Sequence, residues 1–138
     1  MIFSQMLEIT PGGGFAVQNI THLVHAFVGS TQVERGQLIA FYKHSTGSIF
    51  IGEHEGGIIA DLEGMLETLA PTDGEYHHHL REVDFNGYAH IRAALMPTSL
   101  VIPIEDGALV LGTHQEIMVV DSQPEELPRY VFLQVSGE

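Results

Sequence analysis

The alternation of apolar and polar positions changes its period several times along the chain. Apolar residues alternate loosely with polar ones from Ile2 to Thr10, and compact apolar runs occupy residues 37–42 and 48–52. These patterns predict β-strands, with a further short strand over 15–18. We expect the strands at 37–42 and 48–52 to be neighbours in one sheet, joined by the polar loop 43–47.

Helical spacing of apolar positions appears in three other segments. The longest predicts an amphipathic helix over about 57–69. A short helix is predicted over about 22–28, and another over 86–95 that ends before Pro97. The stretch 72–85 is polar and is predicted to be irregular.

Short strand patterns occupy the last third of the chain, at 100–104, 108–111, 116–120 and 129–135. Asp106-Gly107, between the first two, is typical of a tight hairpin turn. No repeat, linker or low-complexity segment divides the 138 residues. The sequence therefore predicts a single domain over 1–138, of the α+β class, with antiparallel, sandwich-like sheets and two or three helices.

The net charge of the chain argues against two classes of partner. The chain has 18 acidic and 5 basic side chains, and its net charge is −13. Binding to nucleic acid or to an anionic membrane needs clustered lysine and arginine, so neither partner is expected. The chain has no cysteine, no signal-peptide pattern and no apolar run long enough to span a bilayer. We therefore expect a cytoplasmic protein without disulfides or thiolate metal sites.

Nine histidines are unusual for this length, and imidazole is the commonest protein ligand for metals. His44 lies in the loop between two apolar strands, and Glu53 lies at the end of the second of them. If these strands pair, His44 and Glu53 approach one end of a sheet. A solvated polar loop is the alternative, and spacing alone favours it.

Two further candidates lie in the middle of the chain. His77, His78 and His79 are consecutive, so their side chains diverge and at most two of them could readily share an ion; a surface run of histidines is the simpler interpretation. Asn86 and His90 lie four residues apart on one face of a predicted helix. A helix-capping asparagine and a core histidine bonded to backbone explain that pair equally well.

The other histidines carry weaker signals. His114 lies in a predicted hairpin turn, and His22, His25 and His54 are interpreted as surface or interface residues. Without cysteine, a transition-metal site must combine histidine with aspartate or glutamate. Catalytic zinc typically takes three protein ligands and leaves one position open.

The order of these motifs resembles that of the YjbQ family, also called UPF0047 or secondary thiamine-phosphate synthase. The resemblance covers nearly the whole chain and is clearest over 39–138. The matching segments are His44-Ser45-Thr46-Gly47, Gly52-Glu53, Asp73-Gly74-Glu75-Tyr76-His77-His78, Asn86-Gly87-Tyr88-Ala89-His90, Thr98-Ser99, Gly112-Thr113-His114-Gln115 and Pro128-Arg129. The family pattern selects His78 among the three consecutive histidines. The chain departs from that pattern at Gly52, where the family has asparagine, and at His114, where it has tryptophan.

The resemblance implies an α+β fold, a homotrimer and a divalent metal, with zinc expected, on His44, His78 and His90. It also implies a weak thiamine-phosphate synthase activity, which joins a pyrimidine pyrophosphate to a thiazole phosphate and releases pyrophosphate. In that scheme Glu53 is a general base or orients a ligating histidine. The expected contacts to a small phosphorylated substrate are Asn86, Thr98, Ser99, Gln115 and Arg129.

Two other hypotheses stay open on the sequence. The same pocket could bind a metal or small anion in a trimeric module without turnover. Alternatively, the histidines could serve the core of a trimer, in which case their loss disturbs assembly and leaves the metal content unchanged. Metal-dependent release of pyrophosphate distinguishes the enzyme from both.

Overall fold

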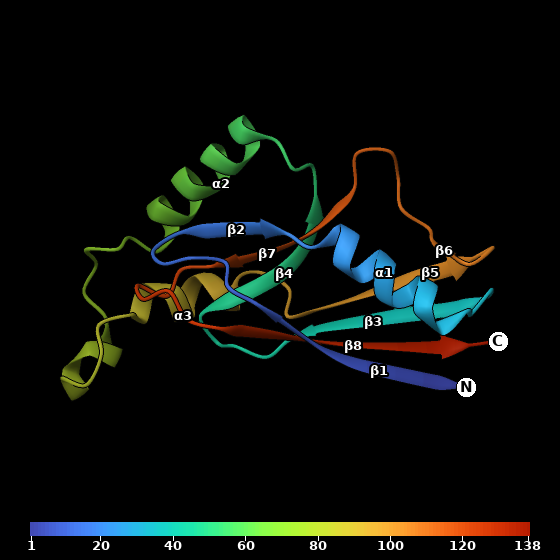
Figure 1. The fold of residues 1–138 in the computed structure, drawn as a ribbon. Helices are drawn as coiled ribbons and strands as arrows, with labels where there is room; N and C mark the ends of the chain where they lie inside the picture. Colours follow the sequence, from blue (N-terminus) through green and yellow to red (C-terminus); the bar gives the residue numbers. More distant parts are fainter.

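The computed structural model describes all residues from 1 to 138. Eight strands form two antiparallel sheets, with the orders β1-β8-β3-β5-β6 and β2-β7-β4 (Figure 1). The elements in chain order are β1 (Ile2–Ile9), β2 (Ala16–Asn19), α1 (Thr21–Thr31), β3 (Gly36–Tyr42), β4 (Gly47–Gly52), α2 (Gly56–Leu69), the 3₁₀ helix η1 (His77–Arg81), α3 (Gly87–Ala94), β5 (Ser99–Glu105), β6 (Ala108–Leu109), β7 (Glu116–Asp121) and β8 (Arg129–Gly137). The predicted α+β class and antiparallel sheets are confirmed, and of the two or three helices predicted the structure has three α-helices.

Local sequence signals account for several element boundaries. Asp106 and Gly107 have φ of 51° and 74° and join β5 to β6, and such a pair of positive φ angles matches the twist of a tight hairpin. The carboxylate of Glu55 accepts hydrogen bonds from the N–H groups of Gly57 and Ile58 and so caps α2. Helix α1 extends beyond its predicted end to Thr31, because Val28 and Thr31 are buried and packing outweighs the low helix propensity of Gly29.

The predicted pairing of residues 37–42 with 48–52 is wrong. Strand β3 lies between β8 and β5 in one sheet, whereas β4 pairs only with β7 in the other. The chain therefore passes from one sheet to the other between Tyr42 and Gly47. The close approach of β4 to β7 requires glycine at this corner, because a Cβ on Gly47 would lie 2.5 Å from the carbonyl oxygen of Val120.

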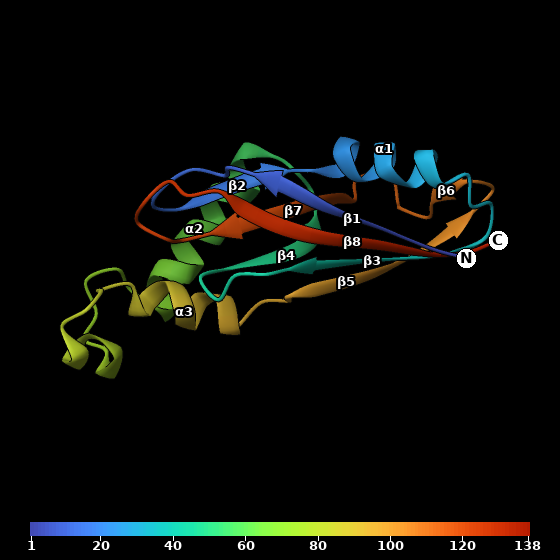
Figure 2. The same ribbon diagram turned by 60° about the horizontal axis from the view of Figure 1, so that its bottom comes forward.

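The main core lies between the two sheets and α1. It contains 19 buried residues, which include the alternating positions Leu38, Ala40 and Tyr42 of β3. The other face of the five-stranded sheet carries no helix (Figure 2). Phe41 and Val101 are exposed there.

Helix α3 and the segment 72–86 lie together at one end of the molecule, and in both views this segment extends beyond α3 (Figures 1 and 2). Arg92, which is 4% exposed, joins α3 to the end of α2. Its Nη2 lies 2.6 Å from Oε2 of Glu67, and its Nε donates to the carbonyl of Ala70 at 3.0 Å. None of the helices combines the length and the apolar character that crossing a bilayer requires.

Candidate functional site

His78, Asn86 and His90 come together where η1 meets α3. The ring centroids of His78 and His90 are 4.8 Å apart. Nε2 of His78 lies 2.7 Å from Oδ1 of Asp84 and 3.1 Å from Oδ1 of Asn86. A donor, Nη2 of Arg81, also lies 3.2 Å from Nε2, but the contact to the carboxylate is shorter. The neutral ring therefore carries its proton on Nε2 toward Asp84, and Nδ1 keeps a free lone pair. Asp84 thus sets the tautomer of His78, a role that the sequence pattern did not reveal.

Neighbouring residues hold this arrangement in place. His79 accepts a hydrogen bond at Nε2 from the N–H of Gly87 at 3.0 Å. This bond satisfies a backbone N–H of the first turn of α3 that has no partner within the helix. The amide of Asn86 does not cap the helix; its Nδ2 donates to Oε1 of Gln123 at 2.9 Å. A Cβ at Gly87 would lie 2.8 Å from Cβ of Tyr76, so glycine is needed where the two segments meet. His79 is therefore structural, and Asn86 positions His78.

His78 and His90 line an open cavity of about 340 Å³. This volume lies at the lower end of the range for small-molecule sites. The ring of His90 makes no hydrogen bond within the chain, and Glu75 contributes a carboxylate to the same lining. The cavity therefore combines a free imidazole, an oriented imidazole and an acidic group.

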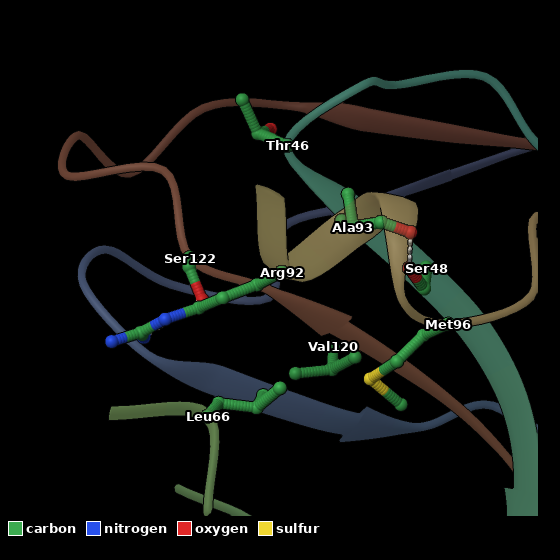
Figure 3. Close-up of a pocket in the computed structure, with 9 residues that line it drawn as sticks. Thr46, Ser48, Leu66, Arg92, Ala93, Met96, Val120 and Ser122 are labelled. Carbon is green, nitrogen blue, oxygen red and sulfur yellow. Dashed lines mark hydrogen bonds between the residues drawn. The ribbon is translucent and has the colours of Figure 1, made fainter. Parts of the chain in front are cut away.

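A second cavity lies between α3 and strands β4 and β7 (Figure 3). Its volume is about 10 Å³, which suits a single water molecule and excludes a substrate. Ser48 lines it and donates to the carbonyl of Ala93 at 3.1 Å, while Arg92 reaches Ser122 at 3.3 Å. These contacts fix α3 against the three-stranded sheet and thereby fix the position of His90.

The histidine pair fits a divalent metal in part. Imidazole and carboxylate groups suit zinc, and a metal-bound histidine usually donates its second N–H to a carboxylate, as His78 does to Asp84. No group of three His, Asp or Glu side chains within the chain is arranged to hold a metal ion. Two of the three predicted ligands, His78 and His90, are thus together, and the third is elsewhere.

His44, the third predicted ligand, lies in a separate network with Arg129. Nη1 of Arg129 is 3.1 Å from Nδ1 of His44, and the backbone N–H of Tyr130 donates to Nε2 at 2.8 Å. The ring also packs against Tyr130, with centroids 6.0 Å apart. Since both ring nitrogens face donors, neither is open to a metal in this arrangement.

Asp121 is the centre of this second network. Its side chain is 2% exposed, and its Oδ2 lies 3.1 Å from Nε of Arg129. The hydroxyls of Tyr42 and Thr46 donate to its two oxygens at 2.5 and 3.0 Å. Burial raises the pKa of Tyr42 well above its usual range, and the hydrogen bond to Asp121 raises it further. Sequence reasoning missed Asp121, although an aspartate directly after a run of buried strand residues indicates a buried polar group.

Hydrogen bonds join the two networks into one polar region. Asn86 links His78 to the side chain of Gln123, and the backbone N–H of Gln123 donates to Oδ1 of Asp121 at 2.9 Å. Asp121 in turn holds Arg129, beside His44. The predicted residues at this end of the molecule therefore share one connected scaffold.

Glu53 and Gln115 lie at the end of the three-stranded sheet opposite to His44. Gly47, near His44, pairs with Asp121, whereas Gly52 pairs with Glu116. Oε1 of Glu53 is 3.9 Å from Nδ1 of the exposed His114, and Gln115 accepts from the N–H of Gly112 at 2.7 Å. The expected approach of Glu53 to His44 followed from the wrong strand pairing, and the length of β4 separates them within one chain.

Thr98 and Ser99 stand at the start of β5, and both are exposed. The carbonyl of Thr98 accepts from the N–H of Tyr42 at 2.8 Å, and Ser99 pairs with Phe41 across the sheet. Both therefore lie near the end of β3 that leads to His44. Their hydroxyl groups make no hydrogen bond within the chain.

We expect stability to depend on pH through His44. Burial lowers the pKa of His44, and the positive charge of Arg129 lowers it further. The unfolded chain then binds this proton at higher pH than the folded protein, so stability is lost as pH falls through about 6.5. The melting temperature should fall between about pH 7 and about pH 5.5, and less steeply in His44→Asn. Equal slopes in the two proteins would contradict this assignment.

The sequence matches the family described as "UPF0047 protein YjbQ-like" over residues 5–138. The chain belongs to this family. It is 33% identical over 120 residues to a UPF0047 protein of Methanothermobacter thermautotrophicus, which covers 87% of this chain and 82% of that one. A match to a YjbQ protein of Salmonella typhimurium has 28% identity over 111 residues and covers 80% of each chain.

Solved structures of YjbQ relatives share the fold. The crystal structure of a YbjQ-like protein of unknown function from Sulfolobus solfataricus is similar with a TM-score of 0.94 and 26% identity, covering 100% of this chain and 99% of that one. A YjbQ/UPF0047 family protein from Clostridium acetobutylicum has a TM-score of 0.87 and 31% identity, covering 96% of this chain and 99% of that one. The family and the fold are thereby established, and the reaction has to be inferred from the site.

Proposed function

We propose that this YjbQ-family protein is a metal-dependent enzyme that acts on a small phosphorylated molecule at the cavity beside His78 and His90. The contact between His78 and Asp84 carries the proposal. A carboxylate at 2.7 Å holds Nε2–H and leaves Nδ1 available, next to the unbonded ring of His90. Carboxylate-oriented imidazoles are typical of metal ligands and of general bases.

We assign a separate role to each residue of this cavity. His78 and His90 would hold the metal, with zinc favoured by the nitrogen donors, and a bound metal supplies positive charge for a departing phosphate or pyrophosphate. Asp84 and Asn86 orient the ring of His78. Glu75, in the same lining, would accept a hydrogen bond from the substrate and so orient it. Glu53 lies far from this cavity within one chain. It stays a predicted base only if a second copy of the chain brings it to the site.

The family resemblance suggests the specific reaction. In thiamine-phosphate synthesis a thiazole phosphate attacks a pyrimidine pyrophosphate, and pyrophosphate leaves. A site with metal-binding imidazoles and room for a small molecule is suited to stabilising such a leaving group.

Release of pyrophosphate tests this reaction. Zinc-loaded protein should release pyrophosphate from the two precursors, the rate should fall when zinc is chelated, and His90→Ala should abolish it. His54→Ala, which removes a histidine far from the cavity, is the matched control and should keep the wild-type rate. Absence of any release by the zinc-loaded wild-type protein would exclude this reaction.

A trimeric module that binds a metal or small anion without turnover is the second candidate. The open face of the five-stranded sheet favours self-association: Met6, Phe132 and Phe41 form a row across β1, β8 and β3, and Met6 and Phe41 are exposed. Exposed apolar patches often mark contacts between subunits. We expect a homotrimer by sedimentation equilibrium, weakened by Phe41→Glu. A wild-type monomer at all concentrations would exclude the trimer.

A further inference from the structure

Two hydrogen-bond donors face the ring of His44, although a neutral imidazole can accept only one hydrogen bond. Nη1 of Arg129 is 3.1 Å from Nδ1, and the backbone N of Tyr130 is 2.8 Å from Nε2. Arginine and backbone N–H groups can only donate, and a protonated ring would accept from neither. One donor therefore lacks a true acceptor in this arrangement.

The shorter contact decides which donor this is. Backbone pairing with β1 and β3 fixes Tyr130 and its neighbours in β8, so its N–H donates to Nε2 along a set direction. The ring proton then sits on Nδ1 and faces the N–H of Arg129. Two converging donors without an acceptor are unfavourable, and an anionic oxygen that accepts from both removes the conflict.

The guanidinium of Arg129 is already held for such a contact. Its Nε lies 3.1 Å from Oδ2 of Asp121, and its Nη2 donates to Oγ1 of Thr46 at 3.0 Å. The side chain is 11% exposed, so its rotamer is fixed before any ligand arrives. Nη1 is the nitrogen left without an acceptor, and a fixed donor of this kind loses little entropy on binding an anion.

The local charge also favours an anion. Only 5 side chains of the chain are basic, and Lys43 and Arg129 both act on His44. Asp121 neutralises part of the charge of Arg129, whereas Lys43 is exposed and makes no ion pair. Asp121 thus offsets Arg129, and Lys43 leaves one positive charge beside His44 that no carboxylate of the chain pairs with.

We propose that Nη1 of Arg129 and Nδ1–H of His44 form a binding subsite for a phosphate group, with the charge of Lys43 beside it. His44 is then a hydrogen-bond donor to the ligand. The subsite rests on the proposed function for its use, which is to hold one phosphate of the substrate. Its binding of inorganic phosphate needs neither the metal nor turnover.

Titration of inorganic phosphate into the metal-free protein tests the subsite. Nitrogen-15 NMR should place the His44 proton on Nδ1, and phosphate should shift the resonances of that ring. By calorimetry, His44→Phe and Arg129→Lys should each weaken phosphate binding about tenfold or more, because each removes a hydrogen bond to a charged group. Arg35→Gln is the matched control: Arg35 is exposed and pairs with Glu105, and its loss should leave the affinity unchanged.

Three results would overturn the subsite: a His44 proton on Nε2, no phosphate binding at millimolar concentrations, or equal affinity in wild type and His44→Phe. Melting curves check that each variant is folded. If Arg129→Lys does not fold, the affinity of His44→Phe alone decides the outcome. The two proposals fail separately. Loss of pyrophosphate release with phosphate binding intact counts against the reaction, whereas absence of phosphate binding counts against the subsite.

Discussion

Replacing Asp121 by asparagine should lower the free energy of unfolding by about 3–5 kcal/mol, the range measured when one partner of a buried ion pair is removed. The side chain of Asp121 is 2% exposed. Its two oxygens face four donors, which are the hydroxyls of Tyr42 and Thr46, the backbone N–H of Gln123 and Nε of Arg129. An asparagine would turn an N–H group toward this set of donors and leave Arg129 without its counter-charge.

Urea denaturation followed by circular dichroism measures this effect, at one fixed protein concentration because association would shift the midpoint. Asp61→Asn is the matched control, since Asp61 is exposed on α2, and it should change stability by less than about 0.5 kcal/mol. An Asp121→Asn protein within about 1 kcal/mol of wild type would show that the network contributes little.

Replacing Asp84 by asparagine should weaken zinc binding about 10- to 100-fold, the usual cost of removing a carboxylate that orients a ligating histidine. Asparagine can still accept a hydrogen bond, but it loses the negative charge at 2.7 Å from Nε2 of His78. Because Asp84 is about half exposed, the variant should fold and melt close to wild type. Loss of affinity without loss of stability separates positioning of the ring from a structural role.

Zinc affinity is measured by competition with a coloured chelator. Glu82→Gln, an exposed change of the same charge two residues away, should bind zinc as wild type does. Equal affinities for Asp84→Asn and Glu82→Gln would mean that Asp84 does not act through His78.

The elements were largely predictable because their signals are local. Helix α2 follows from apolar spacing, and the β5–β6 hairpin follows from Asp106-Gly107, whose backbone adopts the positive φ angles that the turn requires. The membership of β3 and β4 in different sheets was not predictable. Both are short apolar runs, and periodicity records which residues are buried without recording which strand lies alongside.

Only those site residues that belong to a family motif could be predicted from the sequence. His78 and His90 come from the family pattern, and the structure places their rings in contact. Asp84 was missed because it lies in an irregular stretch, and only the turn after η1 brings it back to His78. Contacts between distant segments, such as that of His44 with Arg129, depend on the pairing of β3 with β8, which no local pattern specifies.

The central claim is that His78 and His90 bind a divalent metal, and zinc titration of a double variant tests it most directly. His78→Ala/His90→Ala is compared with His22→Ala/His25→Ala, which removes two exposed histidines of α1. The account predicts that the first variant loses more than about 100-fold in zinc affinity, beyond the loss expected from the orienting carboxylate alone, and that the second binds as wild type does. Equal zinc affinity in wild type and His78→Ala/His90→Ala would contradict it.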